Sequence, residues 1–314
     1  MATKAPLKPI PAVFKHEKVA YWLKNINTAN TREAYRNDLI DFVIFAKIKN
    51  IEDFKKLKRA DIIDWRDSMK GNPKNPNLAI RSIKRKMSTV SKFFEYLCDE
   101  NVLESNVVIG VERPKLQANE GATAAINDHQ ARALLEAPDG NTLKDKRDRA
   151  ILATFLFHGL RRSELCKLKV KDIEEREGIK QFKILGKGDK IRYIPVAPVA
   201  IRKIEEYFNE AGHKKDLEAP LFHSLSNNSK NQDKHMTPIA IYDIVKRYGA
   251  KVGIDVNNFS PHSLRSTAAT NTLRNGEDLR KVQQWLGHAN ISTTALYDKS
   301  DSQPEDSPTF RVRY

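Results

Sequence analysis

The sequence predicts a mainly α-helical protein with a small antiparallel β-sheet, divided into two domains. Apolar residues recur at helical spacing through most of the first 112 residues and again after residue 127. An alternation of period two marks residues 181–195, and a segment with proline, glycine and small residues separates the two helical parts. A chain of 314 residues is also long enough to build two hydrophobic cores.

The first domain, residues 1–112, is predicted to be a small helical domain that follows a basic, proline-bearing arm at 1–11. Four helices are expected here, at 13–25, 31–47, 59–69 and 77–99. Aromatic and apolar side chains form stripes at helical spacing in these segments, as Phe42 and Phe45 do in the second and Phe93 does in the fourth. Such stripes are typical of a helical core.

Positive charge is concentrated in this first domain. The chain carries 55 Lys plus Arg against 40 Asp plus Glu, a net charge of +15. Residues 1–115 hold 23 basic and 14 acidic side chains, so 23 − 14 = +9 of that excess lies there. This balance favours a nucleic-acid partner. The candidate DNA contacts decorate the fourth predicted helix: Arg81, Lys84, Arg85, Lys86 and Lys92. The alternative interpretation of this basic run is an ordinary solvated helix face.

Composition also argues against other classes of protein. No apolar run approaches the roughly 20 residues of a spanning helix, and the N-terminus lacks the apolar core of a signal peptide. Two cysteines, Cys98 and Cys166, do not make a disulfide framework, so we expect a cytoplasmic protein. The eight histidines show no metal-ligand spacing, so we expect no metal and no other cofactor.

A linker is expected at 113–126, before a second domain at 127–300. Helices are predicted there at 127–136, 145–158, 198–211 and 238–252, with a further helix beginning just after Arg161. Strands at 181–185 and 190–195 flank Gly186-Lys187-Gly188-Asp189, which is a hairpin signal with Lys187 at its tip.

The segment 260–299 carries the side chains best suited to chemistry on a phosphate. His262 and Arg265 are three residues apart, so both are expected on one face near a helix start, where anions are attracted. A second helix is predicted to stop at Gly287, which places His288 on a tight turn, and a third short helix carries Tyr297. The alternative for each of these residues taken singly is a solvated helix face or a core tyrosine.

These motifs together resemble those of the tyrosine recombinase (phage integrase) family, which includes Xer-type and Cre-type enzymes. HGLRRSEL at 158–165 and ILGKGDKIRYIP at 184–195 are followed by HSLR, by LGH, and by a tyrosine nine positions after that histidine. The order and spacing match the family from residue 127 to about residue 299. The resemblance implies a helical core-binding domain at 1–112 and a catalytic domain at 127–300.

The resemblance also implies a role for each residue in breaking a DNA strand without a metal ion or ATP. Tyr297 is the expected nucleophile, which forms a 3′-phosphotyrosyl bond, and cationic neighbours must stabilise its phenolate. Arg161 and Arg265 match the positions that hold the phosphate oxygens, because a guanidinium fits them and stays charged. The remaining expected roles are those of Lys187 as general acid, His262 as proton carrier, and His288 as phosphate support. Glu164 matches a position that orients active-site groups, although it is equally well an acid at a helix N-terminus.

The expected partner is double-stranded DNA with an inverted-repeat core site, bound by a homo-tetramer in the synaptic complex. The C-terminal tail, 301–314, ends with Phe310, Val312 and Tyr314 alternating with arginines, so we expect it to pack in trans on a neighbouring subunit. A disordered tail, or one folded back on its own domain, is the alternative. Two other functions stay open on sequence grounds: a type IB topoisomerase-like enzyme, and a DNA-binding protein of the same fold without turnover.

Overall fold

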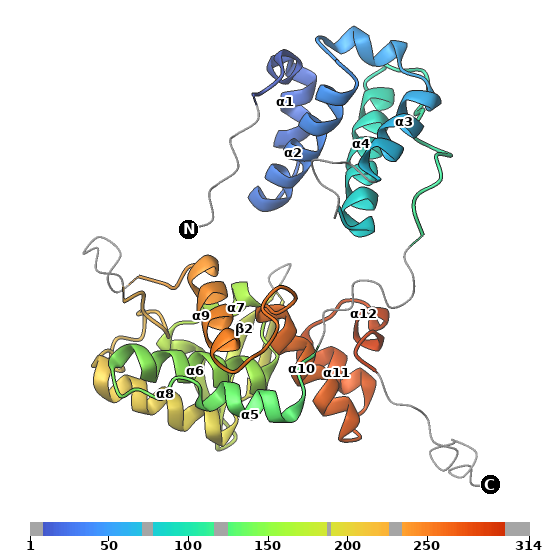
Figure 1. Ribbon diagram of the computed structural model, residues 1–314. Helices are drawn as coiled ribbons and strands as arrows, with labels where there is room; N and C mark the ends of the chain where they lie inside the picture. The colour runs from blue at the N-terminus through green and yellow to red at the C-terminus, as the bar shows by residue number, and fades with distance from the viewer. Residues whose placement is uncertain (1–8, 71–77, 116–124, 187–189, 226–233, 299–314) are drawn as a thin grey trace, which may run out of the picture. The chain divides into compact units, whose positions relative to one another are not determined.

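The computed structural model describes residues 9–70, 78–115, 125–186, 190–225 and 234–298. The chain divides into two compact units, Met1–Gly121 and Ala122–Tyr314, each with its own hydrophobic core. The first unit is helical and the second combines helices with one three-stranded antiparallel sheet (Figure 1). This confirms the predicted fold class, mainly α with a small antiparallel sheet.

Within the residues that the structure describes, the first unit contains six helical segments. They are η1 (Ala12–Lys15), α1 (Glu17–Lys24), α2 (Ala29–Phe45), η2 (Ile51–Lys56), α3 (Arg59–Met69) and α4 (Ile80–Asp99). Their core is rich in edge-to-face aromatic pairs, such as Trp22 with Phe93 at 4.9 Å between ring centroids and Phe42 with Trp65, also at 4.9 Å. Each such pair adds a small stabilisation beyond the burial of its area.

The helix bounds predicted in this unit differ from the structure in several places, and α4, predicted from residue 77, begins at Ile80. The first predicted helix is interrupted at His16, whose extended backbone separates η1 from α1 and whose side chain accepts from Lys18 N. The second begins at Ala29 because Thr28 caps it, and it ends before Lys47, whose φ is 55°. The short 3₁₀ segment η2, which begins with a capping box at Asn50, was not predicted.

The described part of the second unit contains nine helical segments beside the sheet. They are α5 (Asp128–Glu136), α6 (Leu143–His158), α7 (Arg162–Lys167), η3 (Val170–Asp172), α8 (Pro198–Ala211), α9 (Pro238–Lys251), α10 (Pro261–Arg274), α11 (Leu279–Leu286) and α12 (Ile291–Ala295). Helix α6 packs against α8 and α10 and buries the apolar side chains of its second half, residues 150–155.

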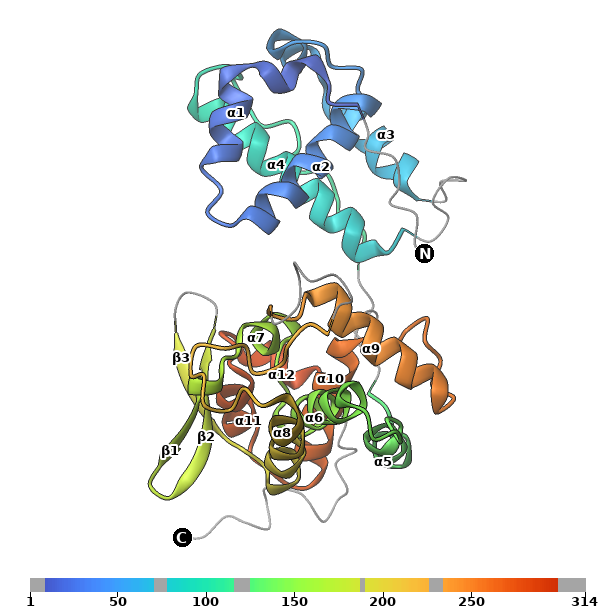
Figure 2. The same ribbon diagram turned by 90° about the vertical axis from the view of Figure 1, so that its left-hand side faces the viewer.

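The sheet has the order β1-β2-β3, with β1 (Ile173–Arg176), β2 (Ile179–Leu185) and β3 (Ile191–Pro195), and Figure 2 shows it at one side of this unit. Strand β1 was not predicted, because its charged sequence has no alternation. It pairs with β2 across the turn Glu177-Gly178, where both residues have positive φ. Phe182 pairs with Ile194, and both are buried, so this face of the hairpin lies on the core.

Candidate functional site

The first turn of α10 carries two of the predicted site residues. Ser260 begins the helix in extended conformation, with its backbone N–H donating to Ser263 Oγ at 3.1 Å, and Pro261 occupies the first turn. His262 is exposed, whereas Arg265, one turn later, is only 1% exposed. The predicted pair therefore lies at one helix start, but its two members differ sharply in access to solvent.

The guanidinium of Arg265 is held by carbonyl groups from two other segments. It donates through Nη1 to Gly159 O at 2.6 Å, at the end of α6, and through Nη2 to Leu286 O at 2.7 Å, at the end of α11. Burial, followed by the nearby charge of Arg161, lowers the pKa of Arg265 to about 10. The side chain is still charged near neutral pH, so a buried cation lies at the centre of this cluster.

His288 contacts this buried arginine directly. Its Nε2 lies 2.8 Å from Arg265 Nη2, and its Nδ1 lies 2.9 Å from Thr294 Oγ1. Because an arginine can only donate, Nε2 is the acceptor, and Nδ1 carries the proton donated to Thr294. Burial, followed by the charges of Arg265 and Arg161, lowers the pKa of His288 to about 4. His288 is therefore a neutral acceptor that orients Arg265.

Tyr297 lies just beyond α12, which Asn290 caps, and its side chain points back into the cluster. Its hydroxyl is 3.5 Å from His262 Nε2, and its ring stacks near that of His288 with 6.0 Å between centroids. The residue is 6% exposed. The phenol thus lies between the two histidines that sequence spacing singled out.

Arg161 and Glu164 lie at the start of α7, where two hydrogen bonds join them. Glu164 Oε2 accepts from the backbone N–H of Arg161 at 2.8 Å, and Oε1 accepts from Arg161 Nη1, also at 2.8 Å. Arg161 Nη2 donates to Gly287 O at 3.0 Å, and its side chain is 36% exposed. A pocket of about 270 Å³ opens beside it, lined by Leu160, Arg161, Arg162, Tyr242, Ser260, Pro261 and His262. Exposed and buried cations beside a phenol suit a phosphate group.

Sequence reasoning missed Arg192, which lies on β3. It donates to both oxygens of Glu164, at 3.0 and 2.9 Å, and through Nε to Trp285 O at 3.1 Å. One signal was available: the period of two puts Arg192 on the same strand face as the buried Ile194. A charged residue at an inward position needs a partner, and Glu164 is that partner.

Lys187 lies outside the described residues. Arg161, Glu164, His262, Arg265, His288 and Tyr297 come together in the second unit. Over the described ranges, no three His, Cys, Asp or Glu side chains gather in a way that could hold a metal ion. The same ranges contain no helix that is long and apolar enough to cross a membrane.

The predicted DNA contacts lie along α4 in the first unit, and three of them have partners there. Arg85 and Lys86 both contact the buried carboxylate of Asp38, and Lys86 also pairs with Asp41. Thr89 Oγ1 donates to Asp38 at 3.0 Å, which completes the carboxylate's surroundings. These cations therefore join α4 to α2.

Lys92 lies on another part of α4, with its Nζ 3.1 Å from the hydroxyl of Tyr35. Arg81 is exposed and Lys84 is half-buried. All five candidates remain predictions as DNA contacts.

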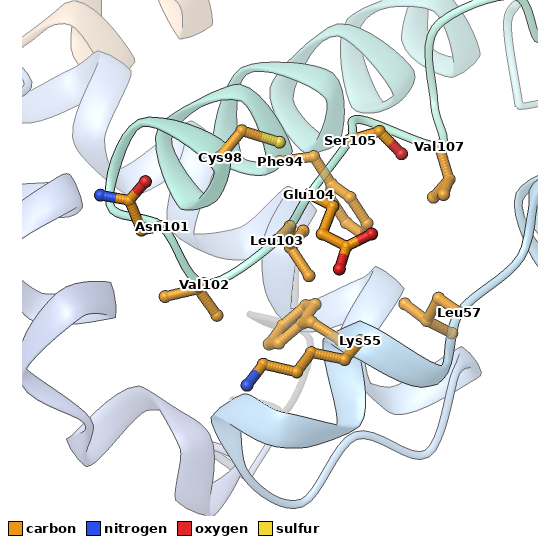
Figure 3. A pocket seen from close by; sticks show the side chains of 11 residues that line it. Lys55, Leu57, Phe94, Cys98, Asn101, Val102, Leu103, Glu104, Ser105 and Val107 are labelled. Carbon is orange, nitrogen blue, oxygen red and sulfur yellow. The ribbon is translucent and has the colours of Figure 1, made fainter.

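A separate pocket of about 660 Å³ lies in the first unit (Figure 3). It is bordered by η2 and by the segment that follows α4, and its charged lining residues are Lys55 and Glu104. It contains none of the predicted catalytic residues.

Comparisons with known proteins agree with the motifs. A model of the phage integrase family matches residues 125–303, and a model of its N-terminal SAM-like domain matches residues 21–101. The chain is 34% identical over 271 residues to tyrosine recombinase XerD of Listeria monocytogenes, covering 86% of this chain and 88% of the relative. It is 33% identical over 285 residues to tyrosine recombinase XerC of Thermodesulfovibrio yellowstonii, covering 89% and 88%.

Among solved structures, the fold is similar to that of the XerH site-specific recombinase bound to palindromic difH substrate in a post-cleavage complex. The TM-score is 0.73 and the identity 23%, over 94% of this chain and 84% of that one.

Proposed function

Because this chain belongs to the phage integrase family of tyrosine recombinases, enzymes that cleave and rejoin DNA, we propose that Tyr297 attacks a DNA phosphate and forms a 3′-phosphotyrosyl intermediate. The observation that supports this most directly is the position of the phenol. Its hydroxyl is 3.5 Å from His262 Nε2, within one cluster with His288 and the buried Arg265. His262 is then the group that takes the phenol proton during attack.

Arg161 and Arg265 are proposed to stabilise charge on the non-bridging phosphate oxygens. Preorganised donors are effective here because they need no rearrangement as the charge develops. Arg161 is half-exposed beside the 270 Å³ pocket, so it offers the first contact with a phosphate. Lys187 is proposed as the general acid that protonates the leaving 5′-oxygen, and cleavage by this route requires neither a metal ion nor ATP.

The proposed substrate is double-stranded DNA with an inverted-repeat core site, bound by four copies of the chain. The basic surface of α4, with Arg81, Lys84, Arg85, Lys86 and Lys92, is proposed to contact the DNA backbone. The domain limits 1–112, 113–126 and 127–300, and the tail 301–314 packing in trans, belong to the same proposal.

The experiment is capture of a covalent adduct on nicked or supercoiled DNA, analysed after denaturation. Wild-type protein should give an adduct, and Tyr297→Phe should give none while it still binds DNA, because only the hydroxyl is removed. An adduct that persists in Tyr297→Phe would refute the assignment. Relaxation of plasmids of unrelated sequence would instead indicate a topoisomerase, whereas cleavage restricted to one site supports the recombinase.

Lys187 is tested on a substrate whose scissile 5′-oxygen is replaced by sulfur. Lys187→Ala should lose cleavage on ordinary DNA and recover it on the sulfur substrate, because a thiolate leaves without being protonated. Equal defects on both substrates would argue against the general-acid role.

A further inference from the structure

Arg192 contacts the site through Glu164 and the end of α11, and the proposed chemistry gives it no role. Its side chain is 14% exposed, and all three guanidinium nitrogens donate hydrogen bonds within the protein. Nη1 and Nη2 donate to the two oxygens of Glu164, and Nε donates to Trp285 O. It therefore joins three segments: strand β3, the start of α7 and the C-terminal end of α11.

The carboxylate of Glu164 is saturated by this arrangement. Oε1 accepts from Arg161 Nη1 at 2.8 Å and from Arg192 Nη1 at 3.0 Å. Oε2 accepts from the Arg161 backbone N–H at 2.8 Å and from Arg192 Nη2 at 2.9 Å. A carboxylate has about four lone-pair sites, so none is left for another donor.

Among the described residues, Arg265 is a further cation close to this carboxylate, with its Nη1 4.0 Å from Glu164 Oε2. Burial by itself raises the pKa of Glu164, but the hydrogen bonds and charge of Arg192, followed by those of Arg161, outweigh it and leave the pKa lowered. The carboxylate is thus charged, and it attracts any arginine within reach. Without Arg192, two of its acceptor sites would open toward Arg161 and Arg265.

We propose that Arg192 is a positioning residue: by saturating Glu164 and fixing the end of α11, it keeps Arg161 and Arg265 in place for the phosphate. This rests on the proposed function of these two arginines. Arg192 also connects β3 to the turn that carries His288, because its side chain extends from β3 and donates to the carbonyl of Trp285 at the end of α11.

The test compares Arg192→Gln with Arg176→Gln in the full-length protein. Arg176 is exposed on β1 of the same sheet and stacks over Tyr193, so its substitution makes the same charge change away from the site. Single-turnover formation of the covalent adduct should be about 100-fold slower in Arg192→Gln, the loss typical of groups misplaced by about 1 Å. Affinity for a single half-site should match that of Arg176→Gln.

A double-mutant cycle distinguishes positioning from a general loss of structure. If Arg192 acts through Glu164, Arg192→Gln combined with Glu164→Gln should be no slower than the slower single variant. If the slowing in the double variant equals the product of the slowing in the two single variants, the proposal is overturned. Arg192→Lys should rescue little, because an ammonium cannot bridge both carboxylate oxygens and the Trp285 carbonyl.

Chemical rescue shows whether a slow variant lacks only the guanidinium group or has lost its folded structure. Guanidinium ion at millimolar concentration should restore adduct formation by Arg192→Ala, and methylammonium should not. Failure of rescue, or an Arg192→Gln rate equal to that of Arg176→Gln, would overturn the inference while leaving the proposed function intact. Absence of an adduct with wild-type protein would instead remove the proposed function itself.

Discussion

Substitution of Gly287 by alanine should destabilise the second unit more than a substitution at a comparable glycine. Gly287 ends α11 in the left-handed region, with φ 67°. A Cβ there would lie 3.0 Å from Arg192 Nη1 and 3.2 Å from Arg192 Cζ. Gly212, which ends α8 with φ 73°, would bring its Cβ within 4 Å of nothing. Gly212→Ala therefore isolates the backbone cost.

The expected magnitudes follow from these contacts. A non-glycine residue in the left-handed region costs about 1 kcal/mol, and both variants pay this. At Gly287 the guanidinium of Arg192 must also shift by a few tenths of an ångström, which stretches its bonds to Glu164 and Trp285. Since a hydrogen bond to a charged group contributes about 1.5–3 kcal/mol, weakening one should bring the total at Gly287 to roughly 2–4 kcal/mol.

Thermal unfolding followed by calorimetry measures the difference. A loss of 1 kcal/mol lowers the melting temperature by about 2–4 °C for a domain of this size, so Gly287→Ala should shift the transition at least about twice as far as Gly212→Ala. In the Arg192→Ala background the two substitutions should cost the same. Equal shifts in the wild-type background would refute the claim that Gly287 is needed for the approach of Arg192.

Three further predictions concern acid stability, the first unit and the tail. His158 and His288 both have pKa values lowered to about 4, for His158 because of burial, so their stabilising contribution is complete above about pH 6.5 and is lost as the pH falls toward 4. Stability should drop by about 1.4 kcal/mol per pH unit for His158 in that range, and by less for the half-buried His288 because solvent screens its charge. His158→Gln should flatten the slope of melting temperature against pH, and an unchanged slope would contradict this. Asp38→Asn should cost the first unit about 2 kcal/mol in denaturant unfolding, because Lys86 and Thr89 lose a charged partner, whereas the more exposed Asp41→Asn should cost less. Deletion of residues 310–314 should spare binding to a half-site but weaken cooperative filling of the second half-site in gel-shift titrations, and unchanged cooperativity would argue against packing in trans.

Local sequence signals predicted some helix bounds well, in particular where a glycine follows the last turn, whereas the starts of α2 and α6 were predicted two residues too late. The ranges 59–69 and 198–211 were predicted as they are found for α3 and α8, and Gly159 and Gly287 end α6 and α11. These signals are local because each depends on hydrogen bonds within one turn of the chain. They also placed His262 and Arg265 at one helix start.

Contacts between distant segments could not be predicted in this way. The helical period shows that Lys86 and Thr89 lie on one side of α4, but Asp38, which both contact, is more than forty residues away on α2. Likewise, spacing placed His288 on a turn, while its role as acceptor depends on where Arg265 and Thr294 lie in three dimensions. The periodicity of a sequence shows which side chains share one face of a helix or strand. It does not show which distant segment packs against that face.

The end of α11 explains how three arginines can lie close together at the proposed phosphate site in the absence of DNA. The carbonyls of Trp285, Leu286 and Gly287 accept, in order, from Arg192, Arg265 and Arg161. A helix C-terminus carries partial negative charge and unpaired carbonyls, so it offsets the repulsion among the three guanidinium groups. Glu164 adds a full negative charge to the same cluster. The arginines are thus oriented by the protein rather than by the substrate. In the proposed reaction, a phosphate that enters beside Arg161 meets donors already in place, and this preorganisation would lower the barrier to attack by Tyr297.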